Sequence, residues 1–122
     1  MASLLDSNIV IDALKGIPAA LSEIAALEGD PTISVITRME VLAGCPDGEA
    51  LAKARLLLSK FSALSLSPAV EELAIEIRRA TRLKLPDAII LATARVHGLT
   101  LITRNTNDFP EDDPQIRVPY RL

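Results

Sequence analysis

Short apolar segments alternate with longer amphipathic stretches along the whole of this sequence. The short segments are rich in β-branched and aliphatic residues and predict strands at residues 3–5, 32–35, 63–66 and 100–103, with a fifth at 116–118. Between them, apolar residues recur at intervals of three and four, which is the period of a helix. We therefore predict an α/β fold in which residues 1–122 form a single domain, with a central parallel sheet of about four to five strands flanked by helices.

Glycine, proline and capping residues mark where the predicted helices begin and end. The helices are expected from Ser7 to Gly16, from Pro18 to just before Gly29, over 36–43, from Asp47, from Ser67-Pro68 and from Pro86. The second of them is expected to bury Leu21 and Ile24. The last is apolar nearly all round through Ala94, which predicts a buried helix.

Composition narrows the class of protein. With 122 residues, 49% of them hydrophobic, the chain has enough apolar content for one core and does not fit intrinsic disorder. The longest apolar run is Ala88–Ala92, far short of the roughly 20 residues needed to cross a bilayer. The first residues lack the basic start of a signal peptide. We therefore expect a cytoplasmic protein that does not associate with membranes.

Residue usage excludes several kinds of site. The single cysteine, Cys45, forms neither an internal disulfide nor a zinc site by itself. The single histidine, His97, precedes Gly98 at a predicted helix end, where we expect a capping role. Two phenylalanines, one tyrosine and no tryptophan are too few to grip nucleic acid by base stacking. At a net charge of −3, binding of a polyanion would need a local basic rim and a metal ion.

Four acidic residues fall at the ends of predicted elements. Asp6 follows the first strand, Glu40 lies on the helix after the second, Asp87 opens the most apolar helix and Asp108 follows the fourth strand. Ligands of parallel α/β sheets bind beyond the carboxyl ends of the strands, so we expect these carboxylates to meet there. Clustered carboxylates need a proton or a cation, and oxygen ligands favour Mg²⁺ or Mn²⁺. Such an ion supports phosphodiester hydrolysis without a protein nucleophile.

Each of these acids also has a purely structural interpretation. Asp6 is a candidate helix N-cap, Asp87 suits the dipole of a first helical turn and Asp108 suits a turn. For Glu40 the structural interpretation is an exposed helix face. It fits less well, because a carboxylate among large apolar residues is costly unless it is paired or bound to a metal.

Basic residues near the acids are candidates for binding phosphate groups. Arg38 is close to Glu40 in the chain and Arg104 is close to Asp108. The run Arg78, Arg79, Arg82 and Lys84 either follows a nucleic-acid backbone or forms a solvated helix face.

Four segments of the chain resemble the motifs of PIN-domain ribonucleases, specifically the VapC-type toxins of VapBC toxin–antitoxin pairs. The segments are Leu4–Asp12, Ser34–Gly44, Leu83–Ala94 and Gly98–Phe109, in the family's order. The resemblance implies a PIN-like fold and a phosphodiester hydrolase that cuts RNA with a metal-activated water. It also implies that Mg²⁺ or Mn²⁺ is held by Asp6, Glu40, Asp87 and Asp108, the last directly or through water.

The resemblance assigns further roles near the acids. Thr103 matches a residue that supports the acidic site, while Asn8 and Asn105 match polar residues that orient it. Asn105 stands where many members have an acid, and the stretch 82–85 lacks the glycine that often precedes the third motif. The candidates for substrate binding are Arg38, Arg82, Lys84 and Arg104.

The family resemblance also implies partners. They are an RNA substrate (tRNA, rRNA or mRNA), whose cleavage inhibits translation, and a cognate VapB-type antitoxin laid across the active-site groove. Assembly into a homodimer, and into a heterotetramer or larger complex with antitoxin, is implied as well. We expect the second and fourth helices to offer the apolar strip that receives the antitoxin. The alternatives are a non-catalytic PIN-like binding module, whose acids serve as caps, and a metal phosphatase acting on small phosphate esters.

Overall fold

The computed structural model describes residues 2–110 and 112–122, which form one parallel sheet with helices on both faces. In chain order the elements are β1 (Ser3–Leu5), α1 (Ser7–Leu14), α2 (Pro18–Ala25), β2 (Thr32–Ser34), α3 (Val35–Ala43), α4 (Gly48–Leu58), β3 (Ser62–Leu64), α5 (Pro68–Ala80), α6 (Leu85–Val96), β4 (Thr100–Ile102) and β5 (Ile116–Arg117). The predicted α/β class and all five predicted strands are confirmed, with end shifts of one or two residues.

The order of the strands in the sheet is β3-β2-β1-β4-β5, and every pairing is parallel. From β1 in the centre the chain builds β2 and β3 on one side, then returns to build β4 and β5 on the other. The reversal falls between β1 and β4, where the backbone N–H of Asp6 donates to the carbonyl of Ile102 at 2.9 Å. In open parallel sheets a ligand-binding crevice lies beyond the carboxyl ends of the strands at such a reversal.

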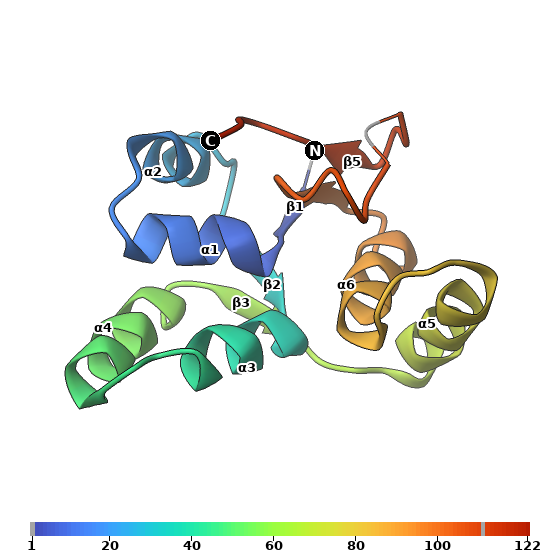
Figure 1. Cartoon of the computed structure of the whole chain (residues 1–122), viewed down its shortest axis with the longest axis horizontal. Helices are drawn as coiled ribbons and strands as arrows, with labels where there is room; N and C mark the ends of the chain where they lie inside the picture. The colour runs from blue at the N-terminus through green and yellow to red at the C-terminus, as the bar shows by residue number, and fades with distance from the viewer. Residues whose placement is uncertain (1, 111) are drawn as a thin grey trace.

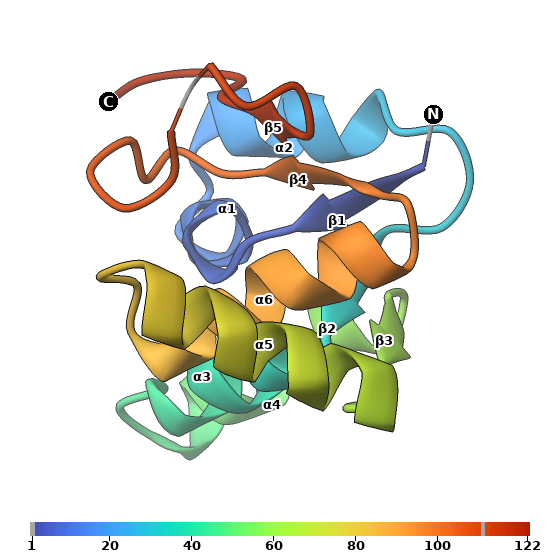
Figure 2. The ribbon, with the colours of Figure 1, turned by 90° about the vertical axis from the view of Figure 1, so that its right-hand side faces the viewer.

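Alternation along the central strands divides the core into two halves. Leu4 and Leu101 are buried against α5 and α6, whereas Leu5 and Ile102 are buried against α1, α3 and α4. Successive side chains of a strand point to opposite faces of the sheet, so the short strand β1 contributes side chains to both halves of the core. Figure 1 shows α5 and α6 on one side of the sheet and α1, α2 and α4 on the other. In Figure 2, α5 lies outside α6, which therefore separates it from the sheet.

Local capping signals set the helix boundaries as predicted. The carboxylate of Asp47 accepts a hydrogen bond from the Ala50 N–H at 2.7 Å at the start of α4, and the Ser67 hydroxyl accepts from Val70 at the start of α5. His97 is the C-cap of α6, and the glycine after it has φ of +64°, a conformation that side chains disfavour. The predicted burial of α6 is also confirmed.

The expectation that α2 buries Leu21 is wrong, because the side chain is 47% exposed. The helix turns Ala20 and Ile24 inward, and Leu21 lies just outside that stripe. α2 also ends earlier than predicted, at Ala25.

A partly buried ion pair ties three distant segments together. Asp12 on α1 is 1% exposed and accepts hydrogen bonds from Nε and Nη2 of Arg104, at 2.6 and 3.0 Å. The Tyr120 hydroxyl donates to the same carboxylate at 2.8 Å. The Arg104 guanidinium holds the pKa of Asp12 below its usual value. The loop after β4 and the C-terminal segment are therefore both fixed to α1.

Among the described residues, no helix is both long enough and apolar enough to pass through a membrane.

We expect Asp12→Ala to lower the free energy of unfolding by about 2 kcal/mol, because it removes the carboxylate that accepts hydrogen bonds from Arg104 and Tyr120. The control is Glu23→Ala, which breaks the ion pair with Arg117, a side chain that is 57% exposed, and should cost less than about 1 kcal/mol. Urea denaturation followed by circular dichroism measures both. Equal losses in the two variants would contradict the role assigned to Asp12.

Candidate active site

The four carboxylates lie where β1 and β4 end, and the structure brings their charges together. Asp6 directly follows β1, Glu40 is on α3, Asp87 is in the first turn of α6, and Asp108 is in the loop after β4. The charges of the other three raise the pKa of Asp87, and those of Glu40 and Asp108 raise the pKa of Asp6. Four separate elements thus converge on one acidic cluster.

Asp6 is the most firmly held of the four. It is 4% exposed, and its Oδ2 accepts hydrogen bonds from the Thr103 hydroxyl at 2.7 Å and the Asn8 amide at 3.2 Å. Its Oδ1 accepts from the Ser7 N–H at 2.7 Å, so Asp6 is also the N-cap of α1. Burial raises the pKa of Asp6, and the hydrogen bonds from Thr103 and Ser7 oppose that rise. The capping interpretation and a place in the acidic cluster both apply to this residue.

Asp108 is oriented by Asn105. The side-chain amide of Asn105 donates to Oδ2 of Asp108 at 2.9 Å, and its carbonyl accepts from the Asp108 N–H at 3.3 Å. The Asn105 N–H in turn donates to the Thr103 hydroxyl at 3.0 Å. A chain of hydrogen bonds therefore connects exposed Asp108 to buried Asp6 through Asn105 and Thr103.

Glu40 is exposed, which removes the burial cost expected from its apolar neighbours in the sequence. α3 turns Thr37 and Val41 inward and leaves Glu40 on its solvent side. The Ser7 hydroxyl donates to Oε1 of Glu40 at 2.8 Å and lies 3.2 Å from the Thr37 hydroxyl. Ser7 and Thr37 were not predicted as site residues. The signal for Ser7 was its place beside Asp6 in the first turn of α1.

Asp87 carries the clearest electrostatic signature. Burial and the charges of Asp6, Asp108 and Glu40 raise its pKa from 3.8 to about 6, while Lys84 opposes the rise. At neutral pH the cluster therefore holds more negative charge than it tolerates easily, which favours binding of a proton or a cation.

The donor set consists of carboxylate oxygens, which suits Mg²⁺ or Mn²⁺. In the conformation of residues 2–110 and 112–122, no three His, Cys, Asp or Glu side chains are grouped so as to hold a metal ion. Glu40 and Asp108 are both exposed, and each accepts a side-chain hydrogen bond through one carboxylate oxygen, from Ser7 and Asn105 respectively. The residues fit the ion in chemistry and charge.

The candidate phosphate-binding residues lie in different surroundings. Arg104 is paired with Asp12, which sequence reasoning missed because the two are 92 residues apart. Arg82 and Lys84 are exposed in the turn between α5 and α6, and Lys84 is close enough to Asp87 to lower its pKa. Arg38 is half-buried on α3.

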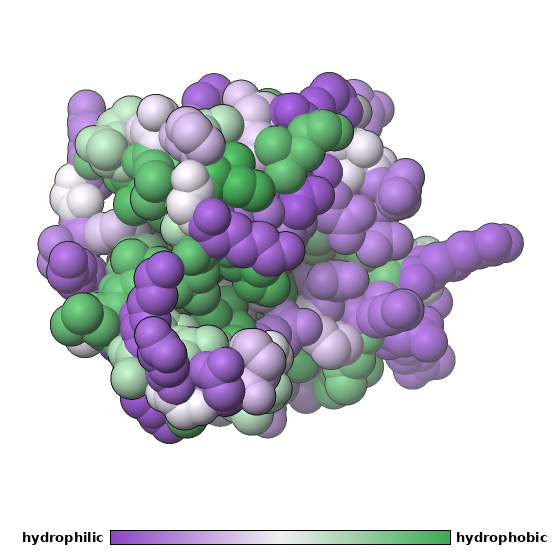
Figure 3. Space-filling model, turned by 60° about the vertical axis from the view of Figure 1, so that its left-hand side comes forward, coloured by the Kyte–Doolittle hydropathy of each residue, from purple (hydrophilic) through white to green (hydrophobic). Residues whose placement is uncertain are grey.

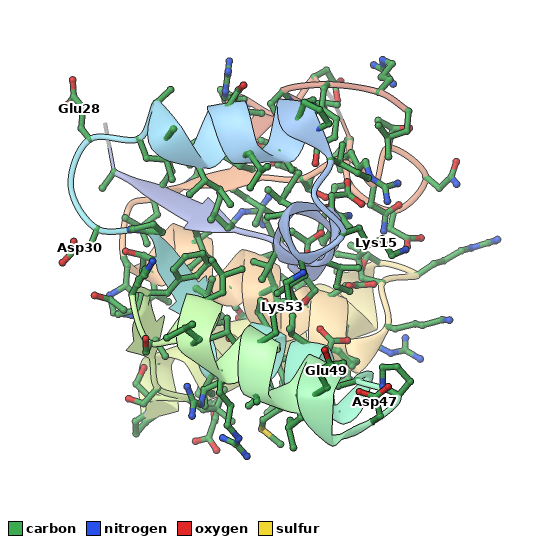
Figure 4. All side chains as sticks on the ribbon, turned by 90° about the vertical axis from the view of Figure 1, so that its left-hand side faces the viewer. Lys15, Glu28, Asp30, Asp47, Glu49 and Lys53 are labelled. Carbon is green, nitrogen blue, oxygen red and sulfur yellow. The ribbon has the colours of Figure 1, made fainter. Side chains whose placement is uncertain are left out.

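An apolar groove of about 300 Å³ reaches from α1 and α4 to the acidic cluster. It is lined by Ile11, Leu14, Lys15, Glu40, Val41, Gly44, Cys45, Pro46, Ala50 and Lys53. Figure 3 shows apolar surface in a hollow between hydrophilic side chains on this side of the molecule, and in Figure 4 Lys53 reaches from α4 toward α1. Of the second and fourth helices, on which an apolar strip is expected, α4 lines this groove together with α1, whereas α2 lies outside it and carries an exposed Leu21.

Comparisons with known proteins agree with this geometry. The family model described as PIN domain matches residues 3–111. The chain is 32% identical over 129 residues to Ribonuclease VapC10 of Mycobacterium tuberculosis, covering 98% of this chain and 93% of that protein. It is 34% identical over 128 residues to Ribonuclease VapC19 of the same organism, covering 96% and 98%. A solved toxin–antitoxin complex from Klebsiella pneumoniae superposes with a TM-score of 0.91 at 40% identity, covering 99% of this chain and 100% of that chain.

The raised pKa of Asp87 predicts a pH-dependent gain in stability from Asp87→Asn. Without metal, the native state favours the protonated carboxyl, so this contribution is fully present below pH 3.8 and is lost as the pH rises through about 6. We expect the variant to melt on the order of 5 °C above the unsubstituted protein near pH 7 and at the same temperature near pH 4. Thermal unfolding in EDTA measures the difference. A difference that does not change with pH would contradict the clustering of charge at Asp87.

Proposed function

The chain belongs to the PIN domain family, and from this premise we propose that it is a metal-dependent endoribonuclease, the toxin of a VapBC-type toxin–antitoxin pair. The single observation that carries the proposal is the convergence of four carboxylates at the reversal point of the sheet, with the pKa of Asp87 raised to about 6. The names of two relatives, both ribonucleases, support RNA as the substrate. Cleavage of tRNA, rRNA or mRNA in the cytoplasm would inhibit translation.

The residues proposed to hold Mg²⁺ or Mn²⁺ are Asp6, Glu40, Asp87 and Asp108. When bound, the ion would activate water for attack on the phosphodiester and stabilise the charge that develops there. Asp108 acts directly or through a water molecule. The raised pKa of Asp87 supports a cation at this position, because a bound cation relieves the repulsion that holds that pKa up.

The surrounding side chains hold the carboxylates in place. Thr103 and Asn8 fix Asp6, so the buried carboxylate keeps one orientation whatever its exposed neighbours do. Ser7 and Asn105 hold Glu40 and Asp108 until an ion competes for them. In such a site the buried Asp6 is held rigidly, whereas the exposed Glu40 and Asp108 can change orientation.

The basic side chains near the cluster are proposed to position the RNA backbone. Lys84 lies near Asp87 and supplies positive charge where a scissile phosphate would approach the acids. Arg82 and Arg38 extend that charge on either side, and phosphate contacts of this kind fix register without reading sequence. Arg104 contributes mainly by holding the loop, since its guanidinium is engaged by Asp12.

We propose a VapB-type antitoxin as the protein partner, seated in the groove between α1 and α4. The toxin–antitoxin complex that superposes on this chain supports such a partner. An amphipathic segment would lay its apolar side on Leu14 and Val41 and place acidic groups near Lys15 and Lys53. Because Glu40 lines the same groove, the segment would reach the acidic cluster and block it. A homodimer that binds two antitoxins, or a larger complex, is proposed as the assembled form.

A non-catalytic binding module is the second candidate. It is favoured by the absence, among the described residues, of a ready-made metal-holding group, and by the internal hydrogen bonds of Glu40 and Asp108. This candidate requires that divalent ions neither stabilise the protein nor support RNA cleavage.

We expect Asp87→Asn to lower RNA cleavage by at least about 100-fold, because it removes one ligand and one charge from the cluster. End-labelled total RNA, treated with antitoxin-free protein in Mn²⁺, in Mg²⁺ and in EDTA, measures cleavage. Circular dichroism checks the fold.

The matched control is Asp47→Asn, which makes the same chemical change at an exposed N-cap where asparagine caps equally well. It should cleave like the unsubstituted protein. Metal-independent cleavage, or full activity of Asp87→Asn, would overturn the proposal. Discrete metal-dependent fragments that only Asp87→Asn fails to produce would support it and exclude the binding module.

A further inference from the structure

A second cavity lies on the other side of the acidic cluster from the α1–α4 groove. It has a volume of about 350 Å³ and is enclosed by the end of α5, by α6 and by the loop after β4. In Figure 2 that loop and the turn between α5 and α6 lie on the same side of the molecule. The floor is apolar and is formed by Ile77, Leu83 and Leu91, all buried. Of the residues that line it, only Asp108 and Arg82 have been assigned roles above.

The cavity shares a residue with the candidate cleavage site. Asp108, oriented by Asn105 within the acidic cluster, also forms part of the cavity wall together with its neighbour Asn107. A chain bound at the acids therefore passes the mouth of the cavity. A group filling it would lie within reach of the phosphodiester that the acids would cleave.

The wall of the cavity is held in place before any ligand arrives. Arg95 on α6 lines the cavity and donates to Asp113 at 2.9 Å, which ties the segment after the loop to α6. Leu83 and Thr81 are anchored in turn, because the Thr81 hydroxyl donates to the carbonyl of Ile77 and accepts from the Leu83 N–H. Largely preformed cavities of this kind are typical of small-ligand sites.

We propose that this cavity binds one unpaired nucleobase of the RNA, next to the phosphodiester that is cleaved. The proposal rests on the proposed ribonuclease function and adds to it the way in which the substrate is selected. The volume lies at the lower end of the range for ligand pockets, which begins at about 300 Å³ and suits a single base rather than a longer segment.

The chemistry of the lining matches a base. A nucleobase has two apolar faces and a polar edge, and the cavity pairs an apolar floor with Glu76, Asn107 and Arg82 as polar groups. Unstacked bases in RNA loops are recognised in this way, by stacking, including on guanidinium planes, and by hydrogen bonds to their edges. The few aromatic residues of the chain therefore do not exclude base recognition of this type.

The basic residues at the end of α5 and in the turn that follows it favour nucleic acid over an apolar protein segment, whereas the lining itself carries Glu76 and Asp108 as well as Arg82 and Arg95. Arg78, Arg79, Arg82 and Lys84 are all exposed near the end of α5 and in the turn that follows it. Arg78, Arg79 and Lys84 would attract the phosphates on either side of the captured base. The basic run thus has a specific purpose: it holds the backbone while the cavity takes the base out of its stack. Single-stranded loops would then be preferred to duplex RNA.

The test fills the cavity without touching the acids. Ala80 is the last residue of α5, is exposed and lines the cavity, so Ala80→Phe places a large side chain in the space for the base. The matched control is Ala69→Phe, the same change at an exposed position at the other end of α5 and outside the cavity lining. Thermal unfolding checks that both variants fold.

The first arm measures binding and needs no cleavage. Fluorescence anisotropy compares oligouridine with oligouridine that carries one central adenosine, cytidine or guanosine, using the Asp87→Asn protein to prevent turnover. We expect one of the four probes to bind at least about fivefold more tightly than the weakest. The preference should vanish in Asp87→Asn/Ala80→Phe and persist in Asp87→Asn/Ala69→Phe. Equal affinities for all four probes, or a preference that survives Ala80→Phe, would overturn the proposal.

The second arm uses cleavage of a short synthetic RNA that contains a site mapped in total RNA. An abasic nucleotide is introduced at each position around the cut in turn. We expect an abasic nucleotide at one position next to the cut to lower kcat/KM of the unsubstituted protein at least about tenfold. Ala80→Phe should cause a similar fall on the intact RNA. On the RNA that is abasic at that position, Ala80→Phe should cause no further fall. The proposal would be overturned if the losses from Ala80→Phe and from the abasic nucleotide were additive. It would also be overturned if no abasic position lowered kcat/KM. If the unsubstituted protein cleaves no RNA, the ribonuclease proposal fails, and the binding arm still decides the cavity.

Discussion

Repulsion among like charges is the constraint around which this small domain is arranged. The parallel order of the strands places the carboxyl ends of β1 and β4 side by side, and the loops that follow them carry Asp6 and Asp108 to the same point. α3 and α6 add one acid each from either side. Burial and the charges of the other three acids raise the pKa of Asp87, and hydrogen bonds from Thr103, Ser7 and Asn105 fix the positions of those three carboxylates.

A partly buried ion pair lies beside the cluster. Arg104 immediately follows Thr103, and its bond to Asp12 anchors the loop that carries Asn105 and Asp108. Without that anchor, repulsion would favour moving the loop away from Asp6. The ion pair between Arg104 and Asp12 therefore stabilises both the fold and the site. It also fixes the loop that forms one wall of the cavity beside Asp108.

Much of the fold follows from local signals, whereas the contacts of the site do not. Ser67, Asp47 and Gly98 act within a few residues of their own positions, so the sequence alone predicts the helix ends that they mark. The pairing of Arg104 with Asp12 spans 92 residues, and that of Ser7 with Glu40 spans 33. Such pairings depend on how helices pack, as does the exposure of Glu40. The placement of Asp6 and Asp108 was predictable because parallel strand order, rather than helix packing, brings the ends of β1 and β4 together.

The distance along the chain between the parts of the cluster also governs when it can form. Asp6 lies near the start of the chain, but its partner Thr103 and the anchoring Tyr120 lie close to the end of the 122 residues. Contacts between segments so far apart in sequence form late, because the intervening chain must first be ordered. During folding the acidic cluster therefore assembles only after the segments between Asp6 and Thr103 have been ordered, and a chain that is only partly folded holds its carboxylates apart.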